Sequence, residues 1–413
     1  NTIFNLSTTL TIDPCGIEIG TGVVSSTFNA NSISDVYSTN TGGYGGRGFT
    51  INTGTASSSI TVSNNIIWNI KGTGWTSMTS DVIAGILIAN SSSTTGGIKL
   101  YYNTVNMSSG AFTPYSTSSS IISAALAIAP TGATTLDIRN NIFATNLVAT
   151  GNASAKVYAI YSGATSSAYS SINYNVYYGY GTQGYAGFIS IDRTTLSNIQ
   201  SGFGSNTNSY VADPQMQSAT NLNPVTSSTS VIPELNSGVT GTGTTTDYNG
   251  TARSSTNPDI GAYEFTSSCD LSGVNTATTL PGGVYSGLNW GNGNNATLTF
   301  SGDATVDGTL TMGGGIIDMG SNTLTIGSST SSVGGITRTG GSVKGKIKRW
   351  FGTNTTTNSL FPLDYGDGVN YCPASISFTG APTTGGTLTA QFFTSGAGTL
   401  SDNGGLGYID ASA

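Results

Sequence analysis

The stretch LDIRNNIF, residues 136–143, places two asparagines inside an otherwise apolar, strand-like run, although asparagine is a poor strand residue. Related runs are ITVSNNII from Ile60, IKLYYNTV from Ile98, SSINYNVY from Ser170 and the weaker STFNANSI from Ser26. Aligned on their last asparagine, they are spaced by 34, 38, 38 and 34 residues, and the aligned residues are Asn31, Asn65, Asn103, Asn141 and Asn175. A period of this size predicts stacked structural repeats.

The columns around these asparagines are apolar in every repeat. Three residues earlier stand Phe28, Val62, Leu100, Ile138 and Ile172. Two residues later stand Ile33, Ile67, Val105, Phe143 and Tyr177. Between the copies lies another short apolar run, such as RGFTI from Arg47 or AGILI from Ala84. Each repeat therefore predicts three short strands and three turns.

Three strands per repeat, stacked at about 4.8 Å, form a parallel β-solenoid in which each coil buries its inward residues against its neighbours. We expect the asparagine column to mark a tight turn, because asparagine tolerates the left-handed backbone region. Its side-chain amide can also bond to the same amide one coil away, as in other stacked β structures. This structural interpretation is preferred over a ligand-binding role for the asparagines.

The composition favours ordered all-β structure and excludes several partners. Charged residues are 8% of the 413 residues, histidine is absent, and 58 residues are glycine, yet 36% are hydrophobic. A net charge of −7 with few basic residues argues against nucleic acid and anionic membranes, since phosphate binding needs clustered Lys and Arg. No run approaches the roughly 18 to 20 apolar residues that span a bilayer, and the start NTIFNLSTTL is unlike a signal peptide.

Three cysteines, Cys15, Cys269 and Cys372, allow at most one internal disulfide. Cys269 and Cys372 are the favoured pair because both lie in the C-terminal part, and three buried thiols are the equal alternative. Without histidine or a C-x-x-C pair, these residues do not predict a zinc site.

After about Tyr178 the repeats give way to less regular sequence that closes near Phe265 with DYNGTARSSTNPDIGAYEF. This closing pattern resembles the end of the right-handed parallel β-helix domains of large secreted surface proteins of Bacteroidota. The resemblance implies an all-β, right-handed parallel β-helix over residues 1–265. It also implies that the closing segment, residues 247–265, covers the open end, with Asp247, Arg253, Asp259 and Glu264 as an ion-pair network.

Residues 266–413 predict a smaller β-rich module, a short β-solenoid or β-sandwich, because ATLTFSGDATVDGTLTMGGGIIDMGSNTLTIGSS alternates strands of about five residues with Gly, Asp and Asn turns. The order of segments resembles the module that follows the β-helix in cargo of the type IX secretion system. The chain ends at GLGYIDASA without the sorting domain of such cargo. We therefore expect it to be part of a longer protein.

The regular repeats offer little for catalysis. Glycosidic hydrolysis needs two carboxylates about 5 to 9.5 Å apart, yet Asp81 and Asp137 are the only acids between Val36 and Ile191, and they occupy different places in their repeats. A calcium-dependent lyase would need more acids and a base. Asp137 and Arg139 share a strand face and can pair with substrate, although outward residues on a solvent-facing sheet are the preferred interpretation. No catalytic residue is predicted.

Two groups of residues are candidate glycan ligands. In VKGKIKRW, the residues Lys344, Lys346 and Lys348 alternate and are expected on one strand face with Arg349 adjacent, as a site for anionic glycan or as protection of an edge strand. Aromatic residues follow the last repeat, and Tyr178 and Tyr180 are the candidates for stacking on sugar rings. Core packing is the alternative for this run, which comprises Tyr174, Tyr177, Tyr178, Tyr180 and Tyr185.

The loop DYGDGVN places Asp364, Asp367 and Asn370 three residues apart, where they can supply oxygen ligands to Ca²⁺. A glycine-rich turn without metal is the preferred alternative, because the spacing of a known calcium loop is missing.

Together these features predict an extracellular structural or adhesive protein of the cell surface, part of a fibre or a long adhesin, that is not an enzyme. We expect it to assemble with further copies of itself, because solenoid ends and edges can pair with another copy. Other surface proteins and glycan are further expected partners. The alternative is a polysaccharide-binding or polysaccharide-cleaving β-helix protein. Fold analogy alone does not establish activity.

Overall fold

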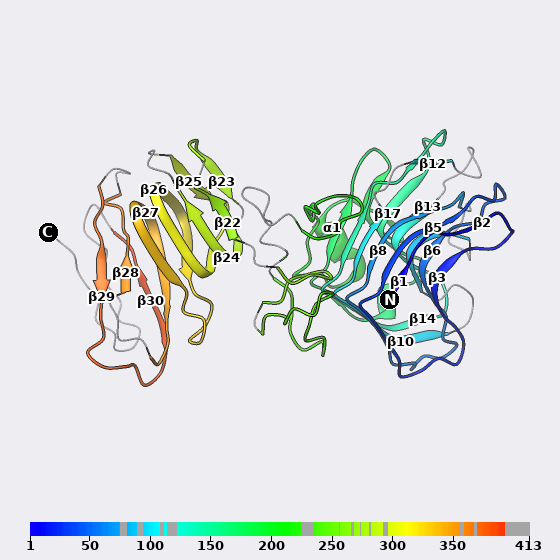
Figure 1. Cartoon of the computed structure of the whole chain (residues 1–413), viewed down its shortest axis with the longest axis horizontal. Helices are drawn as coiled ribbons and strands as arrows, with labels where there is room; N and C mark the ends of the chain where they lie inside the picture. Colours follow the sequence, from blue (N-terminus) through cyan, green and yellow to red (C-terminus); the bar gives the residue numbers. More distant parts are fainter. Residues whose placement is uncertain are drawn as a thin grey trace. The chain divides into compact units, whose positions relative to one another are not determined.

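The computed structural model describes residues 1–74, 81–88, 94–107, 111–113, 122–224, 235, 237–255, 257–265, 268–272, 274–280, 282–291, 296–354, 359–366 and 370–392. The chain forms two compact units (Figure 1). The first comprises Asn1–Val225 and Ser237–Phe265, and Thr266–Ala413 belong to the second.

The first unit is built from three sheets whose strands alternate along the chain. Sheet A contains β1 (Thr2–Ile3), β2 (Leu6–Thr8), β5 (Ser32–Ser38), β8 (Ile66–Lys71), β11 (Thr104–Met107), β15 (Ile142–Thr145) and β19 (Val176–Gly179). Sheet B contains β3 (Cys15–Ile19), β6 (Arg47–Ile51), β9 (Ile83–Ile88), β13 (Ile122–Ile128), β17 (Lys156–Ser162), β20 (Gly184–Ile189) and β21 (Ile191–Arg193). Sheet C contains β4 (Thr27–Asn29), β7 (Ile60–Ser63), β10 (Thr95–Tyr101), β14 (Ala133–Arg139) and β18 (Tyr169–Asn173).

The chain visits sheets B, C and A in turn, and each strand pairs in parallel with the equivalent strand one coil away. Figure 1 shows these coils stacked from blue to green. The predicted all-β, parallel β-helix is therefore confirmed. The two predicted apolar columns face inward: Val62 pairs with Leu100 in sheet C, and Ile67 pairs with Val105 in sheet A. A small parallel pair, β12 (Ala111–Phe112) with β16 (Val148–Ala149), lies outside the three sheets.

The asparagine column forms a continuous hydrogen-bonded ladder between sheets C and A. The Asn65 amide nitrogen donates to the Asn103 side-chain oxygen at 2.8 Å, and the Asn103 amide donates to the Asn141 oxygen at 2.9 Å. From Asn65 to Asn175, each acceptor also takes the backbone N–H of the preceding ladder asparagine, as Asn103 does from Asn65 at 3.1 Å. The second amide hydrogen of Asn103 goes to the Val62 carbonyl. The ladder extends beyond the predicted members, to Asn1 at one end and Ser209 at the other.

The predicted reason for asparagine in this column needs correction. The residue with left-handed φ stands one position earlier and is Ala30, Asn64, Tyr102, Asn140 or Tyr174, with φ between 53° and 61°. The ladder asparagines themselves are not among the residues with positive φ. Asparagine therefore occupies the column because its amide can satisfy buried partners on both neighbouring coils, whereas the turn accepts alanine and tyrosine.

The C-terminal end of the β-helix is covered by a helix and not by the closing segment. Strand β21 turns back antiparallel on β20, and α1 (Leu196–Phe203) follows it. The helix begins at its N-cap Thr195, which accepts from the Asn198 N–H, and ends at Gly204 in the left-handed region. Its apolar residues Ile199 and Phe203 join the core of the coils.

The closing segment lies along the side of the coils, so the expectation that it covers the open end is wrong. The Ala262 N–H donates to the Thr104 hydroxyl at 2.8 Å, and Gly261 donates to the Asn140 carbonyl at 2.9 Å. Ala262 and Tyr263 also form a small apolar cluster with Ile66 on the outer face of sheet A. The closing segment packs here because it shields outward apolar side chains of sheet A from water.

The second unit contains a short solenoid of its own. Its parallel strands are β22 (Ser268–Leu271), β23 (Thr278–Leu280), β24 (Gly283–Trp290), β25 (Thr297–Phe300), β26 (Ala304–Ile326) and β27 (Gly335–Phe351). Successive coils place Leu288 beside Leu310 and Leu310 beside Ile336. The antiparallel strand β30 (Gly386–Ala390) pairs with β27, and β28 (Ser359–Phe361) pairs with β29 (Ala374–Ile376).

Asn103→Ala should destabilise the first unit by at least about 3 kcal/mol, because it leaves buried groups on Asn65, Val62 and Asn141 without their partner. The free energy of unfolding in urea, followed by far-UV circular dichroism, measures this. The exposed Asn208→Ala is the control and should change stability little. Equal stability of both variants would contradict an energetic role for the ladder.

Candidate functional site

Tyr178 and Tyr180, the predicted sugar-stacking residues, lie side by side at the end of sheet A. Their ring centroids are 4.3 Å apart and the rings are inclined by 20°. The Tyr178 hydroxyl donates to Asp213 at 3.1 Å. Burial and the Asp213 carboxylate raise the pKa of Tyr178 to about 12, so its hydroxyl remains a donor at neutral pH.

The other tyrosines of the predicted aromatic run are placed apart from this pair. Tyr177 is buried in the core, where its hydroxyl donates to Asn206 at 2.9 Å. Tyr174 occupies the left-handed turn, and Tyr185 packs against Tyr158 on sheet B. Core packing therefore accounts for Tyr177, and only Tyr178 and Tyr180 share a site.

A groove of about 220 Å³ opens beside the tyrosine pair. Its floor is a column of sheet A in which Asn106, Ala144 and Tyr178 stand in register on successive coils. The segment after α1 forms the opposite wall. The lining residues are Asn106, Ala144, Tyr178, Tyr180, Asp213, Pro214, Met216, Ser218 and Ala219.

The three predicted lysines do not share one strand face. Gly345 has φ of +108°, and the register of β27 against β26 shifts there, so Lys344 pairs beside Asp318 whereas Lys346 pairs beside Thr323. Lys344 also forms an ion pair with Asp318 at 3.0 Å. Lys346 and Lys348 remain together on the outer side. The glycine bends the strand at a corner of the solenoid. The prediction of one shared face was wrong because it assumed that side chains alternate along a straight strand.

Arg349 points inward, so its predicted place beside the lysines is wrong. It is buried, donates to the Leu360 carbonyl at 2.8 Å and lies near the Phe361 ring. Burial lowers the pKa of Arg349. The edge-strand alternative also fails for this part of β27, because β30 pairs with residues Ile347 to Phe351.

The predicted calcium loop is described only in part, because Asp367 lies outside the described residues. The Asp364 side chain is buried and accepts from the Ser342 hydroxyl at 2.8 Å and the Gly366 N–H at 2.7 Å. The Asn370 carbonyl accepts from Tyr365 N–H. Within the described residues no group of three His, Cys, Asp or Glu side chains could hold a metal. The Asp364 carboxylate thus serves the turn, and calcium binding stays a hypothesis.

Each of the three sheets carries a tyrosine that donates to an aspartate about one coil further along. In sheet C, Tyr101 donates to Asp137 at 2.6 Å, and Arg139 pairs with the same carboxylate at 2.7 Å. Arg139 and Asp137 therefore engage each other, as expected for outward residues of one strand. The pKa of Tyr101 is raised to about 12 by burial and by Asp137.

The second and third pairs involve residues that sequence reasoning missed. In sheet B, Tyr158 donates to Asp192 at 2.7 Å and Lys156 pairs with that carboxylate at 2.5 Å. In sheet A the pair is Tyr178 with Asp213. The separations are 36, 34 and 35 residues, which is one coil. This spacing was a usable signal in the sequence. We call the three pairs the cross-coil clamps.

A carboxylate cluster at the edge of sheet B was also missed, because Asp13 precedes the regular repeats. Asp13 pairs with the buried Arg47 at 2.7 Å and accepts from the Gly45 N–H at 2.8 Å. Burial raises the pKa of Asp13 from 3.8 to about 6, against the attraction of Arg47, and Asp81 adds to the rise. The Asp13 carboxylate therefore serves the edge of the sheet, where it pairs with Arg47 and accepts from the backbone.

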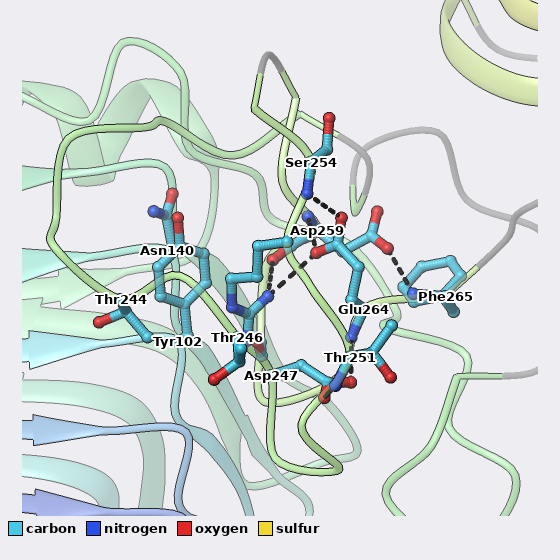
Figure 2. A network of polar contacts seen from close by, with 12 residues as sticks. Tyr102, Asn140, Thr244, Thr246, Asp247, Thr251, Ser254, Asp259, Glu264 and Phe265 are labelled. Carbon is cyan, nitrogen blue, oxygen red and sulfur yellow. Dashed lines mark hydrogen bonds and ion pairs between the residues drawn. The ribbon is translucent and has the colours of Figure 1, made fainter.

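The ionic residues predicted in the closing segment do come together (Figure 2). Arg253 pairs with Glu264 at 3.2 Å and donates to the carbonyls of Asp259 and Gly261. The carboxylates mainly accept backbone N–H groups, as Glu264 does from Ser254 at 2.8 Å. Burial raises the pKa of Asp259 and lowers that of Arg253.

This network is structural, because it fastens the closing segment to the left-handed turns of the coils. Arg253 donates to Asn64 at 2.8 Å and its guanidinium lies 3.8 Å from the ring centroid of Tyr102. The Asn140 carbonyl accepts from Gly261, and its side-chain amide bonds to Val239, which precedes the closing segment, through both nitrogen and oxygen. In two repeats the paired asparagines thus have different partners. The first, Asn64 or Asn140, bonds to the closing segment, and the second, Asn65 or Asn141, continues the ladder.

None of the three cysteines forms a disulfide, so the predicted Cys269–Cys372 bond is wrong. Cys269 is buried, whereas Cys15 and Cys372 are half-buried. The Cys15 thiol donates to the Ile17 carbonyl at 3.1 Å, and burial raises its pKa. These thiols therefore do not staple either unit.

No family model, curated protein or solved structure matches this chain. Among the described residues, no helix has the length and apolar character needed to cross a membrane.

Tyr158→Phe should lower the free energy of unfolding by about 1 to 2 kcal/mol, because Asp192 loses a charge-assisted hydrogen bond while the ring keeps its packing. Urea denaturation measures the change. Tyr161→Phe is the matched control, since its ring is in the same aromatic cluster and its hydroxyl bonds to no other described residue. A larger loss in the control would sink the clamp interpretation.

Asp13 should make the first unit less stable as pH rises. Its folded pKa of about 6 exceeds the ordinary 3.8, so its contribution is complete below pH 3.8 and is lost as pH rises to about 6. The shift corresponds to about 3 kcal/mol at most. Asp13→Asn should flatten the dependence of unfolding free energy on pH between 4 and 7, leaving the part due to Asp259. The same slope in Asp13→Asn and wild type would refute this.

Proposed function

We propose that this chain is a structural part of an extracellular surface protein, a rigid segment of a fibre or long adhesin. The observation that supports the proposal most directly is the ladder from Asn1 to Ser209, which joins every coil of the first unit to the next. Backbone pairing along the same axis adds to it. A protein that separates or connects partners needs this kind of continuity along its length.

The use of the polar side chains also favours a structural role. The cross-coil clamps engage Asp137, Asp192 and Asp213, and the closing segment engages Asp259 and Glu264. An enzyme active site usually keeps titratable groups directed at a cleft where substrate can reach them. Here these carboxylates accept hydrogen bonds from the protein itself.

Polysaccharide cleavage is the less supported alternative. The Asp13 carboxylate is paired with Arg47, and Asp137 is engaged by Arg139 and Tyr101. The outer face of sheet A, which an extended glycan could follow, is partly occupied by Ala262 and Tyr263.

The closing pattern and the module that follows it extend the proposal to a source class, a secreted Bacteroidota surface protein of the type IX kind. Assembly of copies belongs to the same proposal. Because α1 covers the C-terminal end of the β-helix core, contact between first units would use the sides or the opposite end. Strands β1, β2, β3 and β4 are the outermost strands there.

Immunogold electron microscopy of intact source cells, with antibodies raised against this chain, tests the proposal. We expect label on the cell surface or on extracted fibres, at regular intervals. Label confined to soluble medium would contradict a structural role. A parallel assay for new reducing ends and unsaturated products, on pectin, alginate and neutral glucans, should stay at background; depolymerisation would establish the alternative.

A further inference from the structure

The groove beside Tyr178 and Tyr180 has a composition that suits one kind of ligand. Among its lining residues Asp213 is the only charged one, and no lining residue is cationic. The remaining surface combines two phenol rings, one amide and small or apolar side chains. We propose that this groove binds one neutral pyranose residue of an extracellular glycan.

The floor of the groove is shaped by residue size. Along the outward column of sheet A, Trp68, Asn106, Ala144 and Tyr178 stand on successive coils. Ala144, the smallest side chain of this column, is buried at the bottom of the groove. At about 220 Å³ the groove is smaller than the roughly 300 to 1,000 Å³ of sites for drug-sized ligands. That size fits a single sugar ring, with the rest of the glycan in solvent.

The tyrosine pair supplies the apolar contact. Tyr178 is fixed by its hydrogen bond to Asp213 and by its place on β19, and Tyr180 stacks on it at 4.3 Å. Both rings are half-buried, so part of each remains accessible. The C–H face of a pyranose packs on such rings, and a rigid aromatic surface loses little conformational entropy on binding.

Asp213 supplies polar recognition. It is exposed, and its two oxygens already accept from the Tyr178 hydroxyl and the Gln215 N–H. Each carboxylate oxygen has a further lone pair, which can accept a sugar hydroxyl. Its negative charge would repel a uronate or sulfate. The groove therefore selects neutral sugars, which differs from the acidic glycan predicted for the lysines.

This binding site goes beyond the proposed structural role and would stand if that role failed. It is tested on the full chain with laminarihexaose, cellohexaose, xylohexaose and hexagalacturonate as probes, using saturation-transfer NMR and calorimetry. We expect binding of at least one neutral hexasaccharide. Tyr180→Ala should weaken it by about tenfold, which corresponds to the loss of one stacking contact.

Two further variants locate binding at the groove. Ala144→Val, which enlarges a side chain that lines the bottom of the groove, should also weaken binding and provides a second test if Tyr180→Ala proves unstable in urea. Tyr37→Ala, at an exposed tyrosine elsewhere on sheet A, should leave binding unchanged. Absence of binding to all three neutral probes would overturn the proposal. So would preferential binding of hexagalacturonate that is lost in a Lys346→Ser, Lys348→Ser double variant.

Discussion

The buried amide of asparagine is the interaction on which the first unit depends. A turn between sheets C and A leaves backbone N–H and C=O groups inside the coil, where an unpaired group costs about 1 to 3 kcal/mol. Asn103 satisfies Asn65 on one neighbouring coil and Asn141 on the other. No other side chain of this size offers two donors and an acceptor with two lone pairs. Each coil must therefore bring its asparagine beside the next one, whether the repeat has 34 or 38 residues.

Around this ladder, the tyrosines and acids act as connectors between coils. Each cross-coil clamp joins a phenol to a carboxylate on the next coil, and two of the three include a cation, Arg139 or Lys156. A carboxylate with such partners is poorly suited to abstract a proton from substrate. The clamp in sheet A differs because Asp213 is exposed at a groove. The same type of tyrosine–aspartate pair can thus stabilise the coils in sheets B and C and take part in the proposed sugar binding in sheet A.

Much of the fold could be predicted because the ladder and the inward columns repeat in register. The period, the three strands per coil and the all-β class follow from residues such as Asn65, Val62 and Ile67. The predictions that were wrong concerned features that depend on contacts between distant segments or on local backbone bends. Arg253 reaches Asn64 across 189 residues, and the lysine strand bends at Gly345, where its register with β26 shifts. The groove was found only in part, because Asn106 carries no signal until its coil is stacked on the next.

The ladder also has a direction. From Asn1 to Asn141, every ladder amide nitrogen donates toward the next coil, and the asparagine that receives it offers its side-chain oxygen. The aligned amide dipoles add along the axis, as peptide dipoles do in a helix. The two ends of the β-helix are consequently not equivalent: a coil placed before the first must offer amide donors, and a coil placed after the last must offer acceptors. Such an axis has a polarity, like that of a filament with distinct plus and minus ends, and like ends of two copies cannot continue each other's ladder.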